Sequence, residues 1–533
     1  MPPLTRILNG TACTSVTMTH KMQVQPINDD DKENEKTPGS CVTFFTYFAE
    51  STSFMGIPKI YASPRVLFKV MWTLLFLTAA SVMIMQLVGL FTTFYSYPIK
   101  TSVKLGFTAL PFPTVTICNM NPIMLSKAYM LSCDLQKLLK LPSEYQSNDC
   151  VNLTDTVDLT SFTETELVCD EYGCYEEEVS GLNQAYVRKE MIADYLGGES
   201  SALRKFVGHD LETMLIECSI NGRSCSYSNF TAFLSKEHGN CYTLKNNGIQ
   251  ATKSGPESGL SMVINLESED FIDSFKTGYG LRVVIHDNGT RPFPRTEGFT
   301  VSAGSETSIA MKLVKIERLG GLYGSCNDST DFKRRFGVSY TERACREFCL
   351  RNIVIETCKC QPENEETVNP TLKICTTDTE FSCEDRAYGK YMVDTSKGAD
   401  ICKCGSPCSE KVYETSVSSR RWPVLEHVRT LEQQACLIDS FSPKCSYSTY
   451  DFANVDLRTS SFLRLKVYFN SLNFESIKEE PFYDTERFLS DVGGTMGLWT
   501  GASILSLAEF LEILLAMFLW CFTPKSPGTN SVK

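Results

Sequence analysis

The chain has 533 residues, with 51 basic and 63 acidic side chains and a formal net charge of -12. This acidic balance gives no indication of a nucleic-acid partner, which would need a basic surface. The charges are unevenly spread, because no Asp, Glu, Lys or Arg occurs from Val70 to Ile99. Such a run is long enough to supply the roughly 20 residues needed to cross a bilayer, and it begins too late to be a signal peptide. A second apolar segment, Gly493 to Trp520, lies near the C-terminus, so the composition predicts a membrane protein with two spans.

The region between the two apolar segments is rich in cysteine. It contains 20 of the 23 cysteines, an even number and a density typical of an oxidising exterior. Arg65 and Lys69 precede the first segment and Lys525 follows the second, as expected when both termini are cytoplasmic. We therefore expect a multi-pass plasma membrane protein with an extracellular middle region. That region contains four glycosylation sequons, at Asn152, Asn229, Asn288 and Asn327.

In chain order, the sequence predicts six segments. The N-terminus is polar and charged, which is typical of disorder. The next segment is more apolar but broken by Gly and Pro, and we expect it to dip toward the membrane. The six are a disordered cytoplasmic N-terminus (1–40), a pre-helix segment (41–69), the first transmembrane helix (70–92), an extracellular domain (93–485), the second transmembrane helix (486–520) and a cytoplasmic C-terminus (521–533).

Two β-rich stretches flank the extracellular region. LPFPTVTICN follows the first span and FLRLKVYFN precedes the second, and their β-branched and aromatic residues predict strands. We expect one sheet built from both strands, which would tie the two membrane helices to a rigid body. Short strands separated by turn residues are also predicted at GNCYTLKN, GLSMVINLES and GLRVVIHD.

Ten cysteines in the segment 326–408 have a nearly palindromic spacing. Pairing them from the outside inward would give a ladder of five disulfides, although the sequence alone leaves the connectivity open. The close pairs Cys358-Lys-Cys360 and Cys402-Lys-Cys404 could instead bind zinc, but the oxidising exterior and the lack of nearby His oppose this. The even count opposes a cysteine nucleophile. We expect a structural role, with no metal and no cofactor.

The second apolar segment contains two carboxylates, Glu509 and Glu512. A charge at the bilayer centre costs roughly 2.5 to 3.5 kcal/mol on insertion scales, so these side chains, three residues apart on one helical face, are expected to face water. Ser503 and Ser506 lie near the same face. Because each chain has one such helix, a pore requires several chains, whose carboxylates form rings that attract cations. The alternatives are helix packing with a buried proton relay, and carboxylates that snorkel to the inner interface.

Four motifs are specific: FPTVTICN, GNCYTLKN, YTERACREFCLRN and FLSDVGGTMGLWTGASILSLAEFLE. With them the sequence resembles the epithelial sodium channel/degenerin superfamily, which includes the acid-sensing channels and the invertebrate FMRFamide-gated sodium channels, and it is most like the peptide-gated branch. The resemblance runs from Ser51 to Glu512. It implies a homotrimer, or a heterotrimer, whose subunits each have two transmembrane helices and a large disulfide-rich α+β extracellular domain of the clenched-hand type.

The resemblance also implies roles in the second membrane segment, 486–520. It implies a selectivity filter, a site for amiloride-type blockers, a gate position whose enlargement holds such channels open, and acidic pore residues. These are Gly501, Ala502 and Ser503 for the filter, Gly497 for the blocker, Ser490 for the gate, and Asp491, Glu509 and Glu512 for the acidic residues. Before the first helix, the family's re-entrant His-Gly motif is here Met55-Gly56, so a turn at Gly56 is retained and any contact of the histidine is lost.

Disulfide pairing is implied by the same resemblance. The implied pairs are Cys118 with Cys241, Cys218 with Cys225, Cys326 with Cys408, Cys345 with Cys404, Cys349 with Cys402, Cys358 with Cys383, and Cys360 with Cys375. Six extracellular cysteines remain, which suggests three further bridges of open pairing among Cys133, Cys150, Cys169, Cys174, Cys436 and Cys445.

The implied function is a ligand-gated, amiloride-sensitive, sodium-selective channel in the bilayer, and we predict that a short amidated, FMRFamide-like neuropeptide opens it. Such a peptide carries an Arg between aromatic residues, so its receptor should offer carboxylates beside aromatic groups. The acidic stretch TETELVCDEYGCYEEE, with Tyr172 and Tyr175, has that composition. The competing interpretation of this stretch is a solvated acidic loop.

Two other functions are considered. One is a proton-gated channel of the acid-sensing type; His is the side chain best suited to titrate near neutral pH, and the small number of extracellular histidines disfavours this gate. The other is a disulfide-rich cell-surface receptor whose helices only anchor it. An enzyme is not expected, because the chain has no P-loop, His-Glu-x-x-His or Gly-x-Ser-x-Gly motif. The extracellular histidines are His209, His238, His286 and His427.

Overall fold

The computed structural model of the chain describes residues 54–151, 165–170, 173–178, 182–273, 278–362, 372–438 and 461–522, together with a few residues between 46 and 52. These residues form two compact units. The first unit, which we call the helical unit, comprises the helices up to Tyr95 and from Asp484 onward. The second, the outer domain, runs from Ser96 to Tyr483.

Helix α3 dominates the helical unit. It has 30 residues, and within the described part of the chain it is the one helix long and apolar enough to cross a membrane by itself. It extends beyond the predicted 70–92 at both ends and stops three residues before Pro98, as is common because a proline disfavours helical geometry in the residue before it. The helices of this unit are α2 (Ile57–Ala62), α3 (Val66–Tyr95), α14 (Thr485–Thr500) and α15 (Ile504–Phe522).

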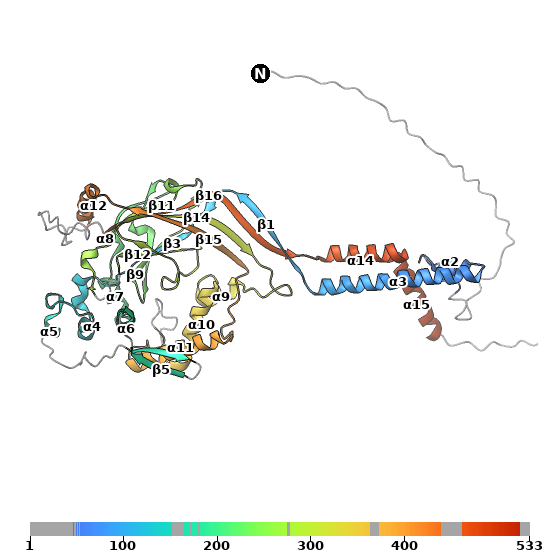
Figure 1. Cartoon of the computed structure of the whole chain (residues 1–533), viewed down its shortest axis with the longest axis horizontal. Coiled ribbons are helices and arrows are strands. Elements are labelled where there is room, and N and C mark those ends of the chain that lie inside the picture. Colours follow the sequence, from blue (N-terminus) through green and yellow to red (C-terminus); the bar gives the residue numbers. More distant parts are fainter. Residues whose placement is uncertain are drawn as a thin grey trace, which may run out of the picture. The chain divides into compact units, whose positions relative to one another are not determined.

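The second predicted membrane helix, 486–520, is broken. α14 lies beside α3 (Figure 1), and α14 and α15 are bent by 75° between Thr500 and Ile504. Only as a bent pair do they qualify as one span by length and composition. The break is local in origin, because Gly501 has φ 67°, a left-handed conformation that ends helices.

A large sheet forms the centre of the outer domain. Counting described residues, it has seven strands in the order β15-β14-β16-β11-β6-β7, with β1 beside β16. β14 and β16 are parallel and the other pairs are antiparallel. The strands are β1 (Ile99–Phe107), β6 (Leu215–Ile220), β7 (Arg223–Ser224), β11 (Leu260–Asn265), β14 (Ser305–Glu317), β15 (Ser409–Arg421) and β16 (Phe462–Pro481).

One strand pairing differs from the prediction. The strand within LPFPTVTICN was expected beside FLRLKVYFN, but it lies in a second sheet, as β3 (Thr114–Asn119). The strand that joins the second half of β16 is β1, in which Ile99 pairs with Pro481. β1 is exposed along most of its length and therefore lacks the alternating buried positions by which a strand is predicted.

The second sheet is antiparallel and, in the described ranges, has five strands in the order β13-β12-β3-β9-β8. Its apolar side chains and those of the large sheet share one core, in which Ile117, Val283 and Leu465 are buried. The three short strands predicted from sequence are β9, β11 and β12. The remaining strands are β2 (Leu110–Pro111), β4 (Thr165–Asp170), β5 (Gly173–Glu178), β8 (Phe230–Ser235), β9 (Gly239–Leu244), β10 (Gln250–Ala251), β12 (Gly280–His286) and β13 (Phe299–Ser302).

Helices surround these sheets. A separate apolar cluster, which includes Leu135, Ile192 and Val207, packs α4, α6 and α7 together. The helices are α4 (Cys133–Leu138), α5 (Asn148–Val151), α6 (Leu182–Gly198), α7 (Ser201–Val207), α8 (Leu211–Met214), α9 (Ser329–Phe336), α10 (Glu342–Cys358), α11 (Asp378–Ser396) and α12 (Leu425–Ile438).

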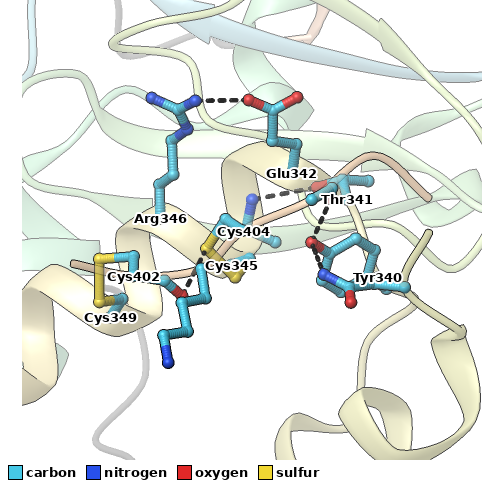
Figure 2. Close-up of a disulfide and its surroundings, with 12 residues drawn as sticks. Tyr340, Thr341, Glu342, Cys345, Arg346, Cys349, Cys402 and Cys404 are labelled. Atoms are coloured by element: carbon cyan, nitrogen blue, oxygen red, sulfur yellow. Dashed lines mark hydrogen bonds and ion pairs between the residues drawn. A yellow bond between two sulfur atoms is a disulfide. The ribbon is translucent and has the colours of Figure 1, made fainter. Parts of the chain in front are cut away.

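Disulfides connect α10 to the chain that follows α11. Figure 2 shows Cys345 and Cys349, one turn apart on α10, bonded to Cys404 and Cys402. The N–H of Ala344 donates to the Thr341 hydroxyl (3.0 Å) and caps this helix. The other bridges seen among the described residues are Cys118–Cys241, Cys133–Cys150, Cys169–Cys174, Cys218–Cys225, Cys326–Cys408, Cys358–Cys383 and Cys360–Cys375.

These bridges include all seven pairs implied by the resemblance. They also supply two of the three pairings that the sequence left open, Cys133 with Cys150 and Cys169 with Cys174. Cys436 is disulfide-bonded as well, whereas Cys445 lies outside the described residues. Part of the predicted acidic loop is not a loop, because residues 165–178 contain the paired strands β4 and β5.

Candidate functional site

One face of α14 packs against α3. The Phe488 ring stacks on Phe94, with centroids 4.3 Å apart, and meets Phe91 edge to face at 5.0 Å. Near the other end of α14, the indole N–H of Trp499 donates to Gln86 Oε1 (2.8 Å). An aromatic contact at one end and a hydrogen bond at the other fix which side of α14 faces α3.

Another side of α14 contains small residues that no described part of the chain covers. Ser490, Gly494 and Gly497 are four and three residues apart, so they share a helical face, and all three are exposed. A Cβ atom added at Gly494 would have no described atom within 4 Å. The predicted gate residue and the predicted blocker residue therefore lie on one open face, while Asp491 is half-buried beside it.

The predicted filter residues form the break between α14 and α15. Gly501 has φ 67° and ψ 12°, and its N–H donates to the Gly497 carbonyl (3.0 Å). An L-residue in this conformation meets a steric penalty that glycine avoids. Ala502 is buried and Ser503 is exposed, so Gly501, Ala502 and Ser503 form a short non-helical segment in which consecutive backbone groups are outside any helix.

Ser503 and Ser506 cap the start of α15 reciprocally. The Ser503 N–H donates to Ser506 Oγ (3.0 Å), and the Ser506 N–H donates to Ser503 Oγ (3.3 Å). This exchange satisfies donors that a helix start leaves without partners. Ser506 is fully buried, and its spacing of three residues from the half-buried Glu509 places the two near the same side of α15.

The motif Met55-Gly56 lies directly at this break. The Met55 N–H donates to the Thr500 carbonyl (2.9 Å), which is one of the carbonyls that the end of α14 leaves open. A Cβ atom at Gly501 would lie 2.8 Å from Met55 Cγ and 3.3 Å from Sδ. Gly56 has φ 108°, in agreement with the turn expected there. The backbone of Met55 makes the hydrogen bond, so this contact does not need a histidine.

The two carboxylates of α15 keep their predicted helical spacing. Glu509 is half-buried and Glu512 is exposed. Both lie on the helix that starts after the break, whereas Ser490 and Gly497 lie on the helix before it. The structure therefore places the predicted pore residues on two helices that meet at the predicted filter.

The outer domain brings together carboxylates that sequence analysis did not single out. Lys236, in the turn between β8 and β9, pairs with Asp194 of α6 and lies 3.7 Å from Glu384 of α11. Asp385 follows on α11 and is exposed on one side, and its partial removal from water together with repulsion from Asp194 and Glu384 raises its pKa to about 6. Burial opposes the charge of Lys236, but Glu384 and Asp194 outweigh it and raise the lysine pKa. We call Asp194, Lys236, Glu384 and Asp385 the acidic cluster.

Two of the four histidines between the apolar segments do not titrate near neutral pH. Burial lowers the pKa of His238 to about 3 and the pKa of His286 to about 4. His209 is also buried, where its Nδ1 lies 2.7 Å from Glu267 Oε2. Within the described residues, the acidic cluster is therefore better placed than His238 or His286 to respond to mild acid.

The acidic hairpin β4–β5 docks on α11. A side chain at Gly389 of α11 would overlap Cys169 Sγ and lie 3.6 Å from Cys174 Sγ, so the hairpin approaches the helix where a side chain is absent. Tyr175 on β5 is half exposed. Tyr172 lies outside the described residues. The hairpin thus presents Tyr175 and the exposed carboxylates of Asp170 and Glu177 while its disulfide faces α11.

The predicted glycosylation sites differ in their surroundings. Asn229 and Asn288 are exposed. Asn327 is half-buried, and its Nδ2 donates to the Tyr340 hydroxyl (2.7 Å). Asn152 lies outside the described residues.

Comparison with known proteins agrees with this arrangement. The family model described as amiloride-sensitive sodium channel matches residues 48–513. The epithelial sodium channel subunit alpha of Neoceratodus forsteri is 26% identical, over 88% of this chain and 79% of the relative. The beta subunit of Homo sapiens is 25% identical over 91% of this chain and 84% of the relative, and the alpha subunit of Xenopus laevis is 27% identical over 88% and 81%. The match includes the outer domain and the filter segment, and the chain belongs to the amiloride-sensitive sodium channel family.

Proposed function

We propose that the chain is a pore-forming subunit of a sodium-selective, amiloride-blocked cation channel in the plasma membrane. α3 and the bent pair α14–α15 are its two spans, the outer domain is extracellular, and both termini are cytoplasmic. Three chains surround the pore. A homotrimer is the simplest assembly, and a heterotrimer stays open because the relatives are named as alpha and beta subunits.

The observation that carries this proposal is the helix break at Gly501–Ser503. It brings backbone carbonyls and the Ser503 hydroxyl, which also accepts a hydrogen bond from the Ser506 N–H, to the junction of α14 and α15, and such oxygens can replace part of the hydration shell of an ion. The left-handed Gly501 and the Met55 N–H on the Thr500 carbonyl hold the break in one conformation. A helix that served only as an anchor would gain nothing from this interruption.

The uncovered face of α14 supports an assembly of several chains. Ser490, Gly494 and Gly497 are exposed in the single chain, and the Ser490 hydroxyl would be costly to bury in lipid without a partner. That cost is avoided if this face of α14 lines a central water-filled path between several chains. In this arrangement Gly501, Ala502 and Ser503 form the filter, Gly497 the blocker site and Ser490 the gate. Rings of Asp491, Glu509 and Glu512 attract the permeant sodium ion.

A short amidated peptide of the FMRFamide type is the proposed opening ligand. The hairpin β4–β5 offers carboxylates and the exposed Tyr175, which match an Arg and an aromatic ring of such a peptide. The neutral, buried His238 and His286 leave few histidines for a proton gate. A ligand opens the channel only if it binds the open arrangement more tightly than the closed one.

The second candidate is opening by protons, and the acidic cluster favours it. Asp385, with a pKa of about 6, would gain a proton during a mild acid step. Proton uptake would relieve its repulsion from Asp194 and Glu384, two carboxylates on different helices.

Whole-cell current from cells that express this chain alone tests the proposal. FMRFamide and a step to pH 5 are each applied in sodium solution, with and without amiloride. An amiloride-blocked inward current to peptide supports the peptide-gated channel, and a current to acid alone supports the second candidate. If neither FMRFamide nor acid evokes a current, and surface expression is verified, the channel needs another ligand or a partner subunit.

The variant Ser503→Cys tests the filter. Replacing the hydroxyl by a larger, weaker ligand should change the sodium to potassium permeability ratio, and an unchanged ratio would move the filter elsewhere. Replacing Glu509 and Glu512 by Gln separates the channel from an anchored receptor. The channel should lose conductance, while a receptor would behave as before.

A further inference from the structure

Exposed apolar residues gather where the two chain ends of the outer domain continue into the helical unit. Leu322 is 72% exposed, Phe482 is 47% exposed and Ile99 is 38% exposed. Single exposed apolar residues are ordinary on protein surfaces, but these belong to three segments that converge. With Tyr97 and Tyr323 they form what we call the exit cluster.

Contacts within the outer domain hold the exit cluster together. The Tyr97 and Tyr323 rings meet edge to face, with centroids 5.4 Å apart. The Phe482 N–H donates to the Pro98 carbonyl (2.8 Å). Leu322 therefore precedes Tyr323, whose ring contacts Tyr97. Phe482 is hydrogen-bonded to Pro98, the residue after Tyr97.

The loop that contains Leu322 is braced at its base. The Leu319 N–H donates to Glu479 Oε2 (2.9 Å), and the Arg318 N–H donates to the Cys408 carbonyl (2.7 Å). A Cβ atom at Gly320 would lie 3.2 Å from Cys326 Sγ, in the Cys326–Cys408 disulfide. Leu322 is thus exposed on a turn whose base is fixed by hydrogen bonds and a disulfide.

Covalent distance places this cluster near the bilayer surface if α3 spans the membrane. Tyr97 is two residues beyond Tyr95, the last residue of α3, and two residues of extended chain reach about 7 Å. Phe482 is two residues before Asp484, which caps the start of α14. Tyrosines beside apolar residues are typical of the membrane interface.

We propose that the turn at 319–324 inserts Leu322 into the outer interface of the bilayer, with Phe482 and Ile99 beside it. The partner is the lipid surface, at the depth of the acyl ester groups. No charged ligand is needed, because the cations around the turn are already engaged. Arg318 pairs with Glu410 (2.6 Å) and Lys100 with Glu480 (3.3 Å). This inference rests on the proposed function, since it requires α3 to be a span.

Fluorescence quenching by lipid tests the inference in the full chain. Cys13, Cys41 and Cys521, which lie outside the extracellular region, are replaced by Ser, and a nitrobenzoxadiazole label is attached at Leu322→Cys. The protein is placed in nanodiscs that contain lipid with a nitroxide at carbon 5. A label at the interface should lose about half or more of its fluorescence.

Two further labels make the outcomes distinguishable. Leu425→Cys at the start of α12, where the leucine is 48% exposed, should keep its fluorescence. Leu74→Cys on α3 reports whether that helix is in lipid. Quenching at 322 and at 74 but not at 425 supports the inference. Quenching at 74 alone overturns it while α3 stays a span, and no quenching at 74 means that the span itself is wrong. Phe482→Cys is the second reporter if the protein labelled at 322 does not fold.

Discussion

The helical unit and the outer domain differ in how many of their apolar side chains are buried within the single chain. The outer domain has a core between two sheets, with residues such as Ile117 and Leu465 almost fully buried, and bridges that join distant segments. α3 has no buried residue, and in α14 only Thr500 is buried. The outer domain thus has its own core within the single chain, whereas the described residues leave most of the surface of α3 and α14 uncovered.

The largest expected effect is a loss of current on substitution of Gly501, which would affect the helical unit and leave the outer domain unchanged. In Gly501→Ala the left-handed conformation costs roughly 1–2 kcal/mol, and the new Cβ would lie 2.8 Å from Met55 Cγ. We expect current to fall about tenfold or more, since each 1.4 kcal/mol is a factor of ten. The unfolding temperature of the outer domain should not change, because that domain contains none of these contacts.

Gly89→Ala on α3 is the matched control for Gly501→Ala. Gly89 is helical, and a Cβ there would meet no described atom within 4 Å. The alanine should therefore leave the current unchanged. If both variants lost current to the same degree, the break would have no special role.

A standing current is the expected result of enlarging Ser490. This residue lies on the uncovered face of α14, so in a trimer a bulky side chain would crowd its copies and hold the helices apart. Ser490→Trp should conduct without ligand and remain blocked by amiloride, whereas Ser490→Ala should stay closed at rest. A silent Ser490→Trp that reaches the surface would show that the uncovered face does not line the gate.

Features that depend on local composition could be predicted from the sequence. The uncharged run from Val70 to Ile99 gave α3, and the resemblance gave the seven disulfide pairs that the structure contains. β1 escaped prediction because it pairs with β16 through its backbone while most of its side chains stay exposed. The break after Thr500 escaped it because small residues in a membrane helix equally favour helix packing.

Contacts between distant segments had no local signal. Met55 reaches the Thr500 carbonyl through a backbone N–H, which any residue except proline could supply. The acidic cluster draws Asp194, Lys236 and Asp385 from three separate elements. The pair Glu384-Asp385 is visible in the sequence, but the burial and the approach of Asp194 on α6, which with Glu384 raise the pKa of Asp385, are not.

Removing disulfides should destabilise the outer domain to different degrees at different bridges. Cys118 and Cys241 are 123 residues apart, and Cys169 and Cys174 are five apart. Loop-closure entropy predicts that replacing the first pair by Ser lowers the free energy of unfolding by about 5 kcal/mol and the second by about 2 kcal/mol. Thermal unfolding of the purified variants measures both. Equal losses would mean that the hairpin β4–β5 contributes as much through its docking on α11 as the Cys118–Cys241 bridge does through its loop.

The smallest expected effect concerns Asp385, a carboxyl group whose ionised form is disfavoured in the folded outer domain. Its pKa is raised from 3.8 to about 6 in the folded state, so between these values the folded protein binds more protons than the unfolded chain. Stability should therefore fall as pH rises from about 4 to about 6 and level off above that. Asp385→Asn removes the ionisation and should flatten this part of the curve of unfolding temperature against pH.

Because Asp385 is still exposed to solvent along part of its surface, the change is expected to be modest. Asp394→Asn, near the other end of the same helix, is a control of equal chemistry outside the acidic cluster. The same two variants separate the opening candidates: if protons open the channel through this cluster, Asp385→Asn shifts the activating pH and Asp394→Asn does not. If a peptide opens it, both variants respond to peptide as the parent does, and the acidic cluster only sets the pH dependence of folding.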